Sequence, residues 1–564
     1  MRASIGVFQP TADLLSTSLF SCQNVTPVDS AVRSYARAKA VGLAHKLTIR
    51  DVSQLSYKFW DMHRDHILSS DGAAATLLTI QYNLVVGTLC QYMSGREDIR
   101  RLAQDILDWK IHAQFCLTEL GHGLDIANLE TTVELLPNGQ LLLNTPSTNA
   151  AKFMPPTIPA GEACIAIVFA KLVVGKEDRG IHPFLVPLND GKCMLPGVTA
   201  RMLPYRNGSR PVNHALTSFH NVVLPRSALL GSTDHLDRNI FMMSISRVAV
   251  GSIALATLAA SFFRVVATIA ARYSQRRTVI GNGSTPAPIM QFRTQQIPIF
   301  TALAQAHVLR AFDRWAVDAF SDLDEDPRVR HGIAACFKVT TVQISQAATI
   351  SVSDRCGAQG LFEHNQMSVL HAEMRGIAIA EGDNLALSIR LATEILLGRY
   401  ALPPPADPQC LLARHEASLI SEARSILSTL SSHRSPDFNR LILPMCMPLV
   451  EAIGHRMAYD ASVAAQVPQC LIDLFVASVI KMDAAWYSEV GGITRRNQAF
   501  LVDKAVTAMS ADLEYHIQSL DAEPYVTAPI SSSHKWEDFV AGLPTYDAAA
   551  AAAAPLPPLV MARL

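Results

Sequence analysis

Several short segments of the sequence hold residue types that could bind a ligand or catalyse a reaction. Glu381 follows the apolar residues 377–380 and precedes Gly382. A carboxylate in apolar surroundings has a raised pKa and can act as a general base, while a glycine lets the chain bend tightly around a substrate. The same residues also fit an acid at the start of a helix, where the helix dipole stabilises it.

Two glycine-containing segments and one arginine could contact a cofactor. Residues 118–126 (TELGHGLDI) contain glycines that permit close backbone approach to a planar ligand. Residues 356–360 (CGAQG) could bring backbone N–H groups to a phosphate, and Arg272 could give a phosphate a forked contact. Each feature alone has an ordinary alternative, namely a turn, a helix cap and a solvated helix arginine.

Composition restricts the class of protein. The 564 residues include 48 basic and 49 acidic side chains, for a formal net charge of −1, so nothing favours nucleic acid or an anionic membrane as partner. Apolar residues make up 49% and charged residues 17%, which indicates large cores and surface hidden in domain or subunit interfaces. The ten cysteines form no C-x-x-C pair, so we predict no metal centre.

The hydrophobic pattern predicts an α+β architecture that is mainly α. Apolar residues recur at helical spacing before residue 110 and after residue 239, whereas short apolar runs lie among Gly, Pro and Asn in between. We predict an N-terminal helical domain over residues 1–112, a small central β-barrel domain over 113–235, a helical bundle over 236–402, a second helical domain over 403–530 and a tail over 531–564.

Particular segments support this division. Residues 131–144 read as a hairpin with an Asn-Gly turn, and 164–170, 182–187 and 215–223 read as strands. The proline-rich residues 402–408 interrupt any helix and read as a linker. The apolar stretch Val248–Phe263 spans 16 residues, short of the ~20 that cross a bilayer, so we predict a buried helix there.

The segment that begins at Thr118 resembles the peroxisomal acyl-CoA oxidases. That family has Thr-Glu-x-Gly-His-Gly and then Leu-Glu-Thr-Thr-Ala, and only Val133 departs from the pattern here. The resemblance is strong over residues 60–400 and weaker from Trp486 onward. Five further segments resemble family motifs in the same order: 221–226 (NVVLPR), 272–277 (RYSQRR), 294–296 (TQQ), 356–360 (CGAQG) and 381–384 (EGDN).

This resemblance implies a flavoprotein enzyme of lipid metabolism. It implies oxidation of an acyl-CoA to a trans-2-enoyl-CoA, as in β-oxidation, with reduction of O2 to hydrogen peroxide. FAD is the implied cofactor, held between the β domain and the helical bundle. The implied partners are an acyl-CoA, molecular oxygen, a second copy in a homodimer and the peroxisomal import receptor, with no nucleic acid and no membrane span.

The resemblance also implies roles for individual residues. Glu381 would be the catalytic base, Thr118 would contact the isoalloxazine ring, and Arg272 would reach the FAD pyrophosphate across the dimer interface. The other implied cofactor-binding residues are Pro156, Gln295, Gly357, Gln359, Gly360, Asp383 and Asn384.

Two positions depart from the family pattern. Residues 152–157 (KFMPPT) stand where the family has Lys-Trp-Trp-Pro-Gly-Gly. Pro156 replaces a glycine that contacts flavin through its backbone, and proline has no N–H to donate. His214 stands where a small residue is usual. These differences favour an unusual acyl group or altered reoxidation of the flavin.

The sequence ends in Ala562, Arg563 and Leu564, a small-basic-leucine tripeptide of the kind that peroxisomal import reads. We therefore expect a peroxisomal protein, with an accidental tail as the alternative. Two other functions stay open at this point. One is an acyl-CoA dehydrogenase that uses another electron acceptor, which Pro156 favours. The other is a non-catalytic acyl-CoA- or flavin-binding relative, although Glu381, Arg272 and Thr118 are all present.

Overall fold

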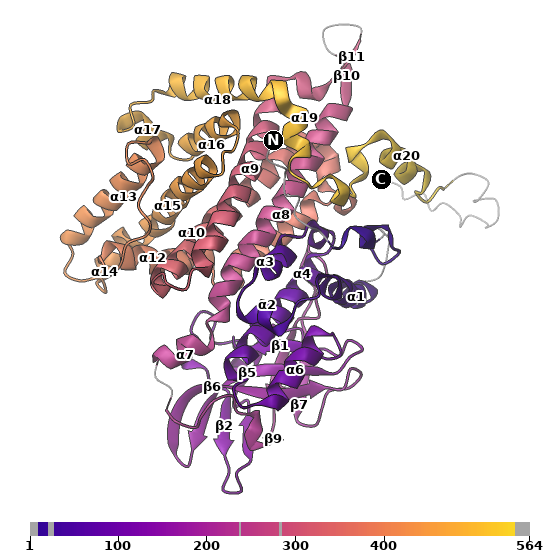
Figure 1. The fold of residues 1–564 in the computed structure, drawn as a ribbon, viewed down its shortest axis with the longest axis vertical. Helices are drawn as coiled ribbons and strands as arrows, with labels where there is room; N and C mark the ends of the chain where they lie inside the picture. The colour runs from indigo at the N-terminus through magenta and orange to yellow at the C-terminus, as the bar shows by residue number, and fades with distance from the viewer. Residues whose placement is uncertain (1–9, 21–26, 236–237, 281–284, 547–564) are drawn as a thin grey trace, which may run out of the picture.

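One long helix, α8 (Arg247–Arg276), runs through the middle of the molecule and organises the helices around it (Figure 1). All of its residues from Val250 to Ala271 are buried, as expected of a mostly apolar helix that is covered on every face. The computed structural model describes residues 10–20, 27–235, 238–280 and 285–546. The alanine run 548–554 and the C-terminal tripeptide lie outside these described residues.

Helices precede the β domain. Their order includes a π-helix, η3, that continues directly from α4. The helices are α1 (Pro27–His45), α2 (Ile49–Ser53), α3 (Tyr57–Arg64), α4 (Gly72–Leu78), η3 (Thr79–Val86), α5 (Gly87–Leu89) and α6 (Glu97–Leu107), with 3-10 turns η1 (Ala12–Ser16), η2 (His66–Ser70) and η4 (Cys90–Tyr92).

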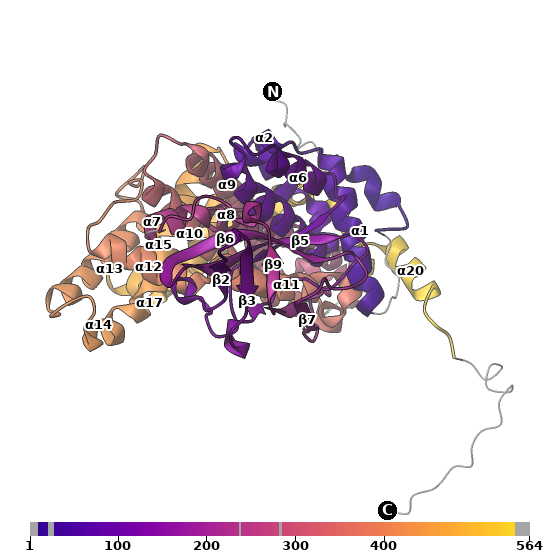
Figure 2. The same cartoon turned by 90° about the horizontal axis from the view of Figure 1, so that it is seen from below.

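The β domain lies below the helical bundle in Figure 1 and in front of it in Figure 2. Six strands form one sheet in the order β1-β5-β2-β3-β9, with β6 also paired to β5, and β4-β8-β7 form a second. The predicted Asn-Gly hairpin is confirmed as antiparallel β2 and β3. The strands are β1 (His112–Cys116), β2 (Thr132–Leu135), β3 (Leu141–Asn144), β4 (Lys152–Phe153), β5 (Cys164–Val174), β6 (Glu177–Asn189), β7 (Val198–Met202), β8 (Ala215–Phe219) and β9 (Val222–Leu224).

Helices resume after the sheets and form the bundle. A short antiparallel pair, β10 (Thr278–Ile280) and β11 (Pro286–Pro288), follows α8 and was not predicted. The bundle helices besides α8 are α7 (Arg238–Ser244), α9 (Arg293–Ser321), α10 (Pro327–Arg355), α11 (Met367–Ile379) and α12 (Asn384–Leu396), with the 3-10 turn η9 (Gly357–Leu361) after α10.

The predicted interruption at residues 402–408 is confirmed, because no helix is assigned between α12 and α13. Most of the second helical region lies on one side of the bundle, whereas its last helix, α20 (Ser533–Ala541), lies with α1 on the other side in both views (Figures 1 and 2). Its helices are α13 (Leu411–Ser428), α14 (Pro436–Leu441), α15 (Leu443–Ala464), α16 (Gln469–Met482), α17 (Ala484–Glu489), α18 (Arg495–Met509), α19 (Leu513–Gln518) and α20 (Ser533–Ala541). The mainly α fold with a central β domain is therefore as predicted, while the exact domain limits stay predictions.

Two helical stretches, Gly72–Tyr92 and Arg247–Arg276, are long and apolar enough to cross a membrane by length and composition. Within the protein, however, 83% and 100% of their most apolar windows are buried, as in core helices. The buried helix predicted over residues 248–263 is confirmed, and it is longer than predicted because α8 continues past the buried Arg264.

Candidate active site

Glu381 lies in the short connection between α11 and α12, where the chain leaves helical geometry. Glu381 has φ 52° and Gly382 has φ 99°, so two successive residues adopt left-handed backbone conformations. A side chain in this region costs about 1–2 kcal/mol, and such strain is concentrated at functional sites. Asp383 then begins α12 as its N-cap and accepts hydrogen bonds from the backbone N–H groups of Leu385 and Ala386.

The carboxylate of Glu381 lies against two helices from other parts of the chain. A Cβ built on Gly251 of α8 would be 1.2 Å from Glu381 Oε2, so the absence of a side chain there makes room for the carboxylate. Asn83 of the π-helix η3 donates from Nδ2 to the same oxygen at 3.5 Å. Ser252, next to Gly251, donates to the Glu381 backbone carbonyl at 2.7 Å.

A buried lysine holds the connection on both sides of Glu381. The Lys338 ammonium of α10 donates to the backbone carbonyl oxygens of Ala380 and Gly382, each at 2.5 Å. Lys338 is fully buried, and burial lowers the pKa of its ammonium to about 8. Its two hydrogen bonds stabilise the strained backbone of the turn, and its ammonium places a positive charge near Glu381.

Burial raises the pKa of the Glu381 carboxyl to about 8, while the positive charges of Lys338 and Arg247 oppose the rise. A carboxylate tuned toward neutrality is suited to accept a proton from a weakly acidic carbon. The geometry therefore agrees with the role of base that the sequence predicts for Glu381, and that role stays a prediction.

Arg247 and Asn83 extend the network behind the glutamate. Nε of buried Arg247 donates to both the backbone oxygen and Oδ1 of Asn83, at 3.1 Å each. Asn83 Nδ2 donates in turn to the Arg247 carbonyl at 3.0 Å. These bonds fix which amide atom of Asn83 faces Glu381, and π-helical turns are often found at functional sites.

Sequence reasoning missed Asn83, Arg247, Gly251 and Lys338. Two signals could have pointed to them. Gly251 interrupts an otherwise apolar helical stretch, and Lys338 is a lone charge in the apolar run of α10. Neither signal shows that the residue contacts the Glu381 segment, because that segment is far away along the chain.

A second group of predicted residues lies at the entrance to the β domain. Thr118 follows β1 and its carbonyl accepts from the Phe153 N–H at 2.9 Å, which brings it close to the segment that leads to Pro156. Its half-buried hydroxyl bonds to none of the described residues. Pro156 is buried, and its carbonyl accepts from the Tyr35 hydroxyl at 3.4 Å.

The segment around Thr118 is fixed by a buried ion pair. Glu119 and Lys152 lie 2.9 Å apart with fully buried side chains. His214, the second departure from the family pattern, donates from Nδ1 to the Met154 carbonyl at 2.7 Å. Burial lowers its pKa to about 4, so its buried Nε2 is a bare acceptor without a partner among the described residues.

A cavity of about 450 Å³ lies between the Cys-Gly-Ala-Gln turn and the end of α8. It is lined by Gly357 and Gln359 together with Arg276 and Arg277, so a phosphate-bearing ligand would meet two guanidinium groups there. Gly357 has φ 61° and open space around its Cα, which permits close backbone approach. This chemistry fits the nucleotide part of FAD.

Gln295 and Gly360 contribute to the framework beside this cavity instead of lining it. Gln295 donates to the Ser274 hydroxyl at 2.9 Å and to the Arg355 carbonyl at 3.1 Å. A Cβ at Gly360 would be 2.4 Å from the Ser353 carbonyl oxygen, so only glycine fits.

Arg272 is not among the residues that line the cavity. Its guanidinium forms forked ion pairs with Glu514, at 2.7 Å, and Glu523, at 2.8 Å, which both come from the C-terminal region. These carboxylates raise its pKa. The predicted contact of Arg272 with a pyrophosphate would therefore require it to leave two acidic partners.

Asn384 gives an independent sign that a ligand completes the site. It is 5% exposed, and neither its Nδ2 nor its Oδ1 has a partner among the described residues. Buried amides are nearly always hydrogen-bonded. A ligand that both donates and accepts would satisfy this group, and the residues present thus fit a cofactor such as FAD.

Comparison with known proteins finds acyl-CoA oxidases that are similar to parts of this chain. The model of the acyl-CoA oxidase C-alpha1 domain matches residues 243–396. The peroxisomal acyl-coenzyme A oxidase 3 of Homo sapiens is 28% identical over 353 residues, which cover 57% of this chain and 50% of the relative. The chain thus matches about half the length of that curated relative.

Solved structures agree in fold. Acyl-CoA oxidase 1 of Yarrowia lipolytica has a TM-score of 0.81 at 18% identity, over 96% of this chain and 91% of that one. Acyl-CoA oxidase 2 of Caenorhabditis elegans, bound with FAD, ascaroside-CoA and ATP, has a TM-score of 0.77 at 17% identity, over 95% and 89%. This chain is thus similar to acyl-CoA oxidases in its C-alpha1 domain, in the half of the human relative that it matches, and in its fold.

Proposed function

We propose that this protein is an FAD-dependent acyl-CoA oxidase that converts an acyl-CoA to a trans-2-enoyl-CoA and reduces O2 to hydrogen peroxide. The observation that carries the proposal is the environment of Glu381, whose carboxyl pKa is raised to about 8 beside Gly251 and Asn83. A solved C. elegans relative bound to FAD and ascaroside-CoA supports the choice of ligands.

In this reaction the residues of the chain position the substrate and move one proton. Glu381 takes the α-proton of the acyl thioester, because a carboxylate of raised pKa can accept a proton from so weak an acid. Lys338 keeps the glutamate backbone in place through its two carbonyl contacts. Bound FAD would supply the acceptor for the hydride from the β-carbon and the route of electrons to oxygen.

The proposed FAD contacts divide between two regions. Thr118, Pro156 and Asn384 would face the ring, and Gly357 and Gln359 line the cavity that suits its phosphates. Arg272, Gln295, Gly360 and Asp383 are proposed as supporting residues around this site, since each already bonds within the fold or packs tightly.

We propose that the protein is a homodimer and that it lies in the peroxisome. The name of the human relative, a peroxisomal acyl-coenzyme A oxidase, supports the compartment. Large apolar side chains are exposed on the bundle, which supports burial against a second copy. They are Leu361, Phe362, Ile379 and Leu385. Sedimentation of the flavin-bound protein tests the dimer, and a monomer at micromolar concentration would contradict it.

Anaerobic reduction by a panel of acyl-CoAs, followed by admission of air, tests the function. We expect bleaching of the flavin and then peroxide at the rate of turnover. Absence of a yellow chromophore after FAD is added would overturn the proposal. Slow reoxidation without peroxide would instead support a dehydrogenase, the function that buried Pro156 favours because it offers no N–H to the flavin region.

A further inference from the structure

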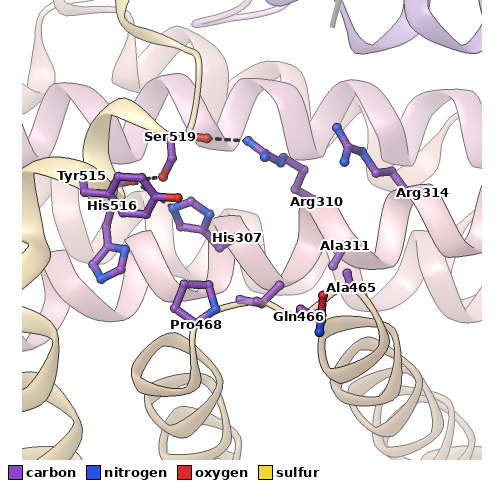
Figure 3. Close-up of a pocket in the computed structure, with 11 residues that line it drawn as sticks. His307, Arg310, Ala311, Arg314, Ala465, Gln466, Pro468, Tyr515, His516 and Ser519 are labelled. Atoms are coloured by element: carbon purple, nitrogen blue, oxygen red, sulfur yellow. Dashed lines mark hydrogen bonds between the residues drawn. The ribbon is translucent and has the colours of Figure 1, made fainter. Parts of the chain in front are cut away.

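A small cavity of about 200 Å³ lies between α9, the turn that joins α15 to α16, and α19 (Figure 3). None of its lining residues belongs to the Glu381 site or to the cavity beside Gly357. Pockets for drug-sized ligands usually measure about 300–1,000 Å³, so this one suits a smaller molecule.

Two arginines of α9 face the cavity one helical turn apart (Figure 3). Like charges at this i,i+4 spacing repel each other. Arg310 donates to the Ser519 carbonyl at 2.5 Å and lies 3.4 Å from one carboxylate oxygen of Asp521. Arg314 is exposed and donates to no described residue. Of these two arginines, only Arg310 therefore has a carboxylate partner among the described residues.

A third arginine adds to this positive charge from the neighbouring helix α8. Arg264 is 7% exposed, its Nη2 donates only to the Ser261 hydroxyl, and its Nε has no partner. Among the residues that the structure describes, no carboxylate oxygen lies within 4.0 Å of its guanidinium. Burial and the charges of Arg310 and Arg314 lower its pKa to about 9.

The nearest buried acid does not offset this charge. Asp313 is bound by Arg64 at 2.7 Å and by the Thr257 hydroxyl at 2.6 Å, so it already forms a neutral pair. Asp521 is left to offset the charges of Arg310, 3.4 Å away, and of Arg264, while no described carboxylate pairs with Arg314. Unbalanced charges of one sign in and beside a cavity attract a ligand of the opposite sign.

The remaining polar groups of the cavity carry no negative charge. Burial lowers the pKa of His307 to about 3, and this neutral ring donates from Nε2 to the His516 carbonyl at 2.9 Å. The hydroxyl of Tyr515 points along the cavity toward the arginine side (Figure 3). The Gln466 amide lines the opposite wall.

We propose that this cavity binds a small oxyanion with two negative charges, namely a phosphate group that is free or is part of a small phosphomonoester. Arg310 and Arg314 would hold it through forked contacts, for which guanidinium geometry is suited, and the Tyr515 hydroxyl would donate a third hydrogen bond. The proposal is independent of the oxidase reaction, because it uses none of the groups around Glu381.

Titration of the flavin-bound protein with inorganic phosphate tests the proposal. Ionic strength is kept constant with sodium chloride, and binding is measured by calorimetry and by the rise in thermal midpoint. We expect one phosphate per chain that Arg314→Gln weakens at least tenfold. Since Arg314 bonds to no described residue, this variant should fold normally. Phosphate bound elsewhere is common to both proteins, so the difference isolates the cavity.

Two further variants sharpen the test. Asp521→Asn removes the competing carboxylate and should tighten phosphate binding. This change is opposite to the one expected for Arg314→Gln, and general destabilisation of the protein would not produce it. Arg434→Gln, a matched change at an exposed arginine of the loop between α13 and α14, should leave binding unchanged. Equal phosphate affinity in wild type and Arg314→Gln, or the same stabilisation by chloride alone, would overturn the proposal.

A parallel titration with glycerol 3-phosphate separates the two sources of the anion. Tighter binding than inorganic phosphate, lost in Arg314→Gln, supports a phosphomonoester. Weaker binding supports the free ion. Failure of both compounds to bind the wild-type protein would contradict an oxyanion site.

Discussion

The carboxylate of Glu381 occupies the space that a side chain at Gly251 would fill, with Oε2 1.2 Å from the position of its Cβ. The two residues are 130 positions apart in the sequence. The glycine of a buried helix thus determines where the proposed base can lie, and both residues have to be considered together.

Gly251→Ala should fold but push the Glu381 carboxylate out of place. A displacement of about 1 Å can cost on the order of 10²-fold in rate. We expect flavin reduction to slow by about that factor while FAD affinity stays within twofold, as measured by stopped-flow and by fluorescence. Gly542→Ala, where the new Cβ would have ordinary contacts from 3.4 Å, is the control. Unchanged reduction in Gly251→Ala would show that the carboxylate lies elsewhere.

Glu381→Gln keeps the size of the side chain but removes the base. Flavin reduction should fall by about 10²–10⁴-fold or more, the range of general-base catalysis, while the spectrum of bound FAD stays almost the same. Stopped-flow reduction by a good substrate measures the loss. Glu363→Gln, at an exposed acid, should reduce normally. Reduction of the Glu381 variant within about tenfold of wild type would exclude Glu381 as the base.

The reduction rate should depend on pH in a definite direction. Because burial raises the pKa of Glu381 to about 8, the folded protein keeps the proton that an ordinary carboxyl loses near 4.5. The active carboxylate therefore increases from about pH 6 to 9, and kcat/KM for reduction should rise through pH 8 and then level off. A rate that is flat over this range would contradict the raised pKa.

Lys338→Met should affect both the turn and the acidity of the glutamate. The positive charge of Lys338 lowers the pKa of Glu381, so its removal should move the midpoint of the pH profile above 8. We also expect slower reduction, because the carbonyls of Ala380 and Gly382 lose their shared donor. Lys504→Met, at an exposed lysine, should leave the profile in place. Slower reduction with an unmoved midpoint would assign Lys338 a purely structural role.

Lys152→Met should destabilise the β domain. It leaves the fully buried Glu119 carboxylate without its cation, and breaking such pairs costs about 3–5 kcal/mol. Urea unfolding measures the change. Lys39→Met breaks an ion pair with Glu162 that is about two-fifths exposed, for which about 0–1 kcal/mol is expected. A similar loss of unfolding free energy in both variants would show that the buried Glu119–Lys152 pair stabilises the protein no more than an exposed pair does.

Local pattern predicted much of the fold, whereas the role proposed for Glu381 came from the resemblance to the acyl-CoA oxidases. The alternation around Asn138 and Gly139 predicted the hairpin. The apolar flanks of Glu381 also fitted an acid at the start of a helix, and two of them, Ile379 and Ala380, are exposed in the structure. The hairpin signal arises from neighbours in the sequence, which is where periodicity and turn chemistry act.

Partners far apart in the sequence could not be predicted in this way. Asn83 reaches Glu381 across 298 positions, and Arg272 meets Glu514 across 242. Such contacts follow from how whole helices pack. For the same reason, the ion pairs of Arg272 with Glu514 and Glu523 could not be predicted from local pattern.

Because Asn83 lies in a π-helix, the number of residues in that helix determines where the Asn83 side chain lies in the site. A π-turn holds one residue more than an α-turn, and such insertions often lie at functional sites. Each residue of an α-helix turns the chain by about 100°, so loss of one residue between Thr79 and Asn83 would rotate the amide off the face that meets Arg247 and Glu381. A substitution between Thr79 and Asn83 is therefore tolerable where the volume of the new side chain fits. Deletion of one residue there would break the contacts of Asn83 with Arg247 and Glu381, although none of these three residues is changed.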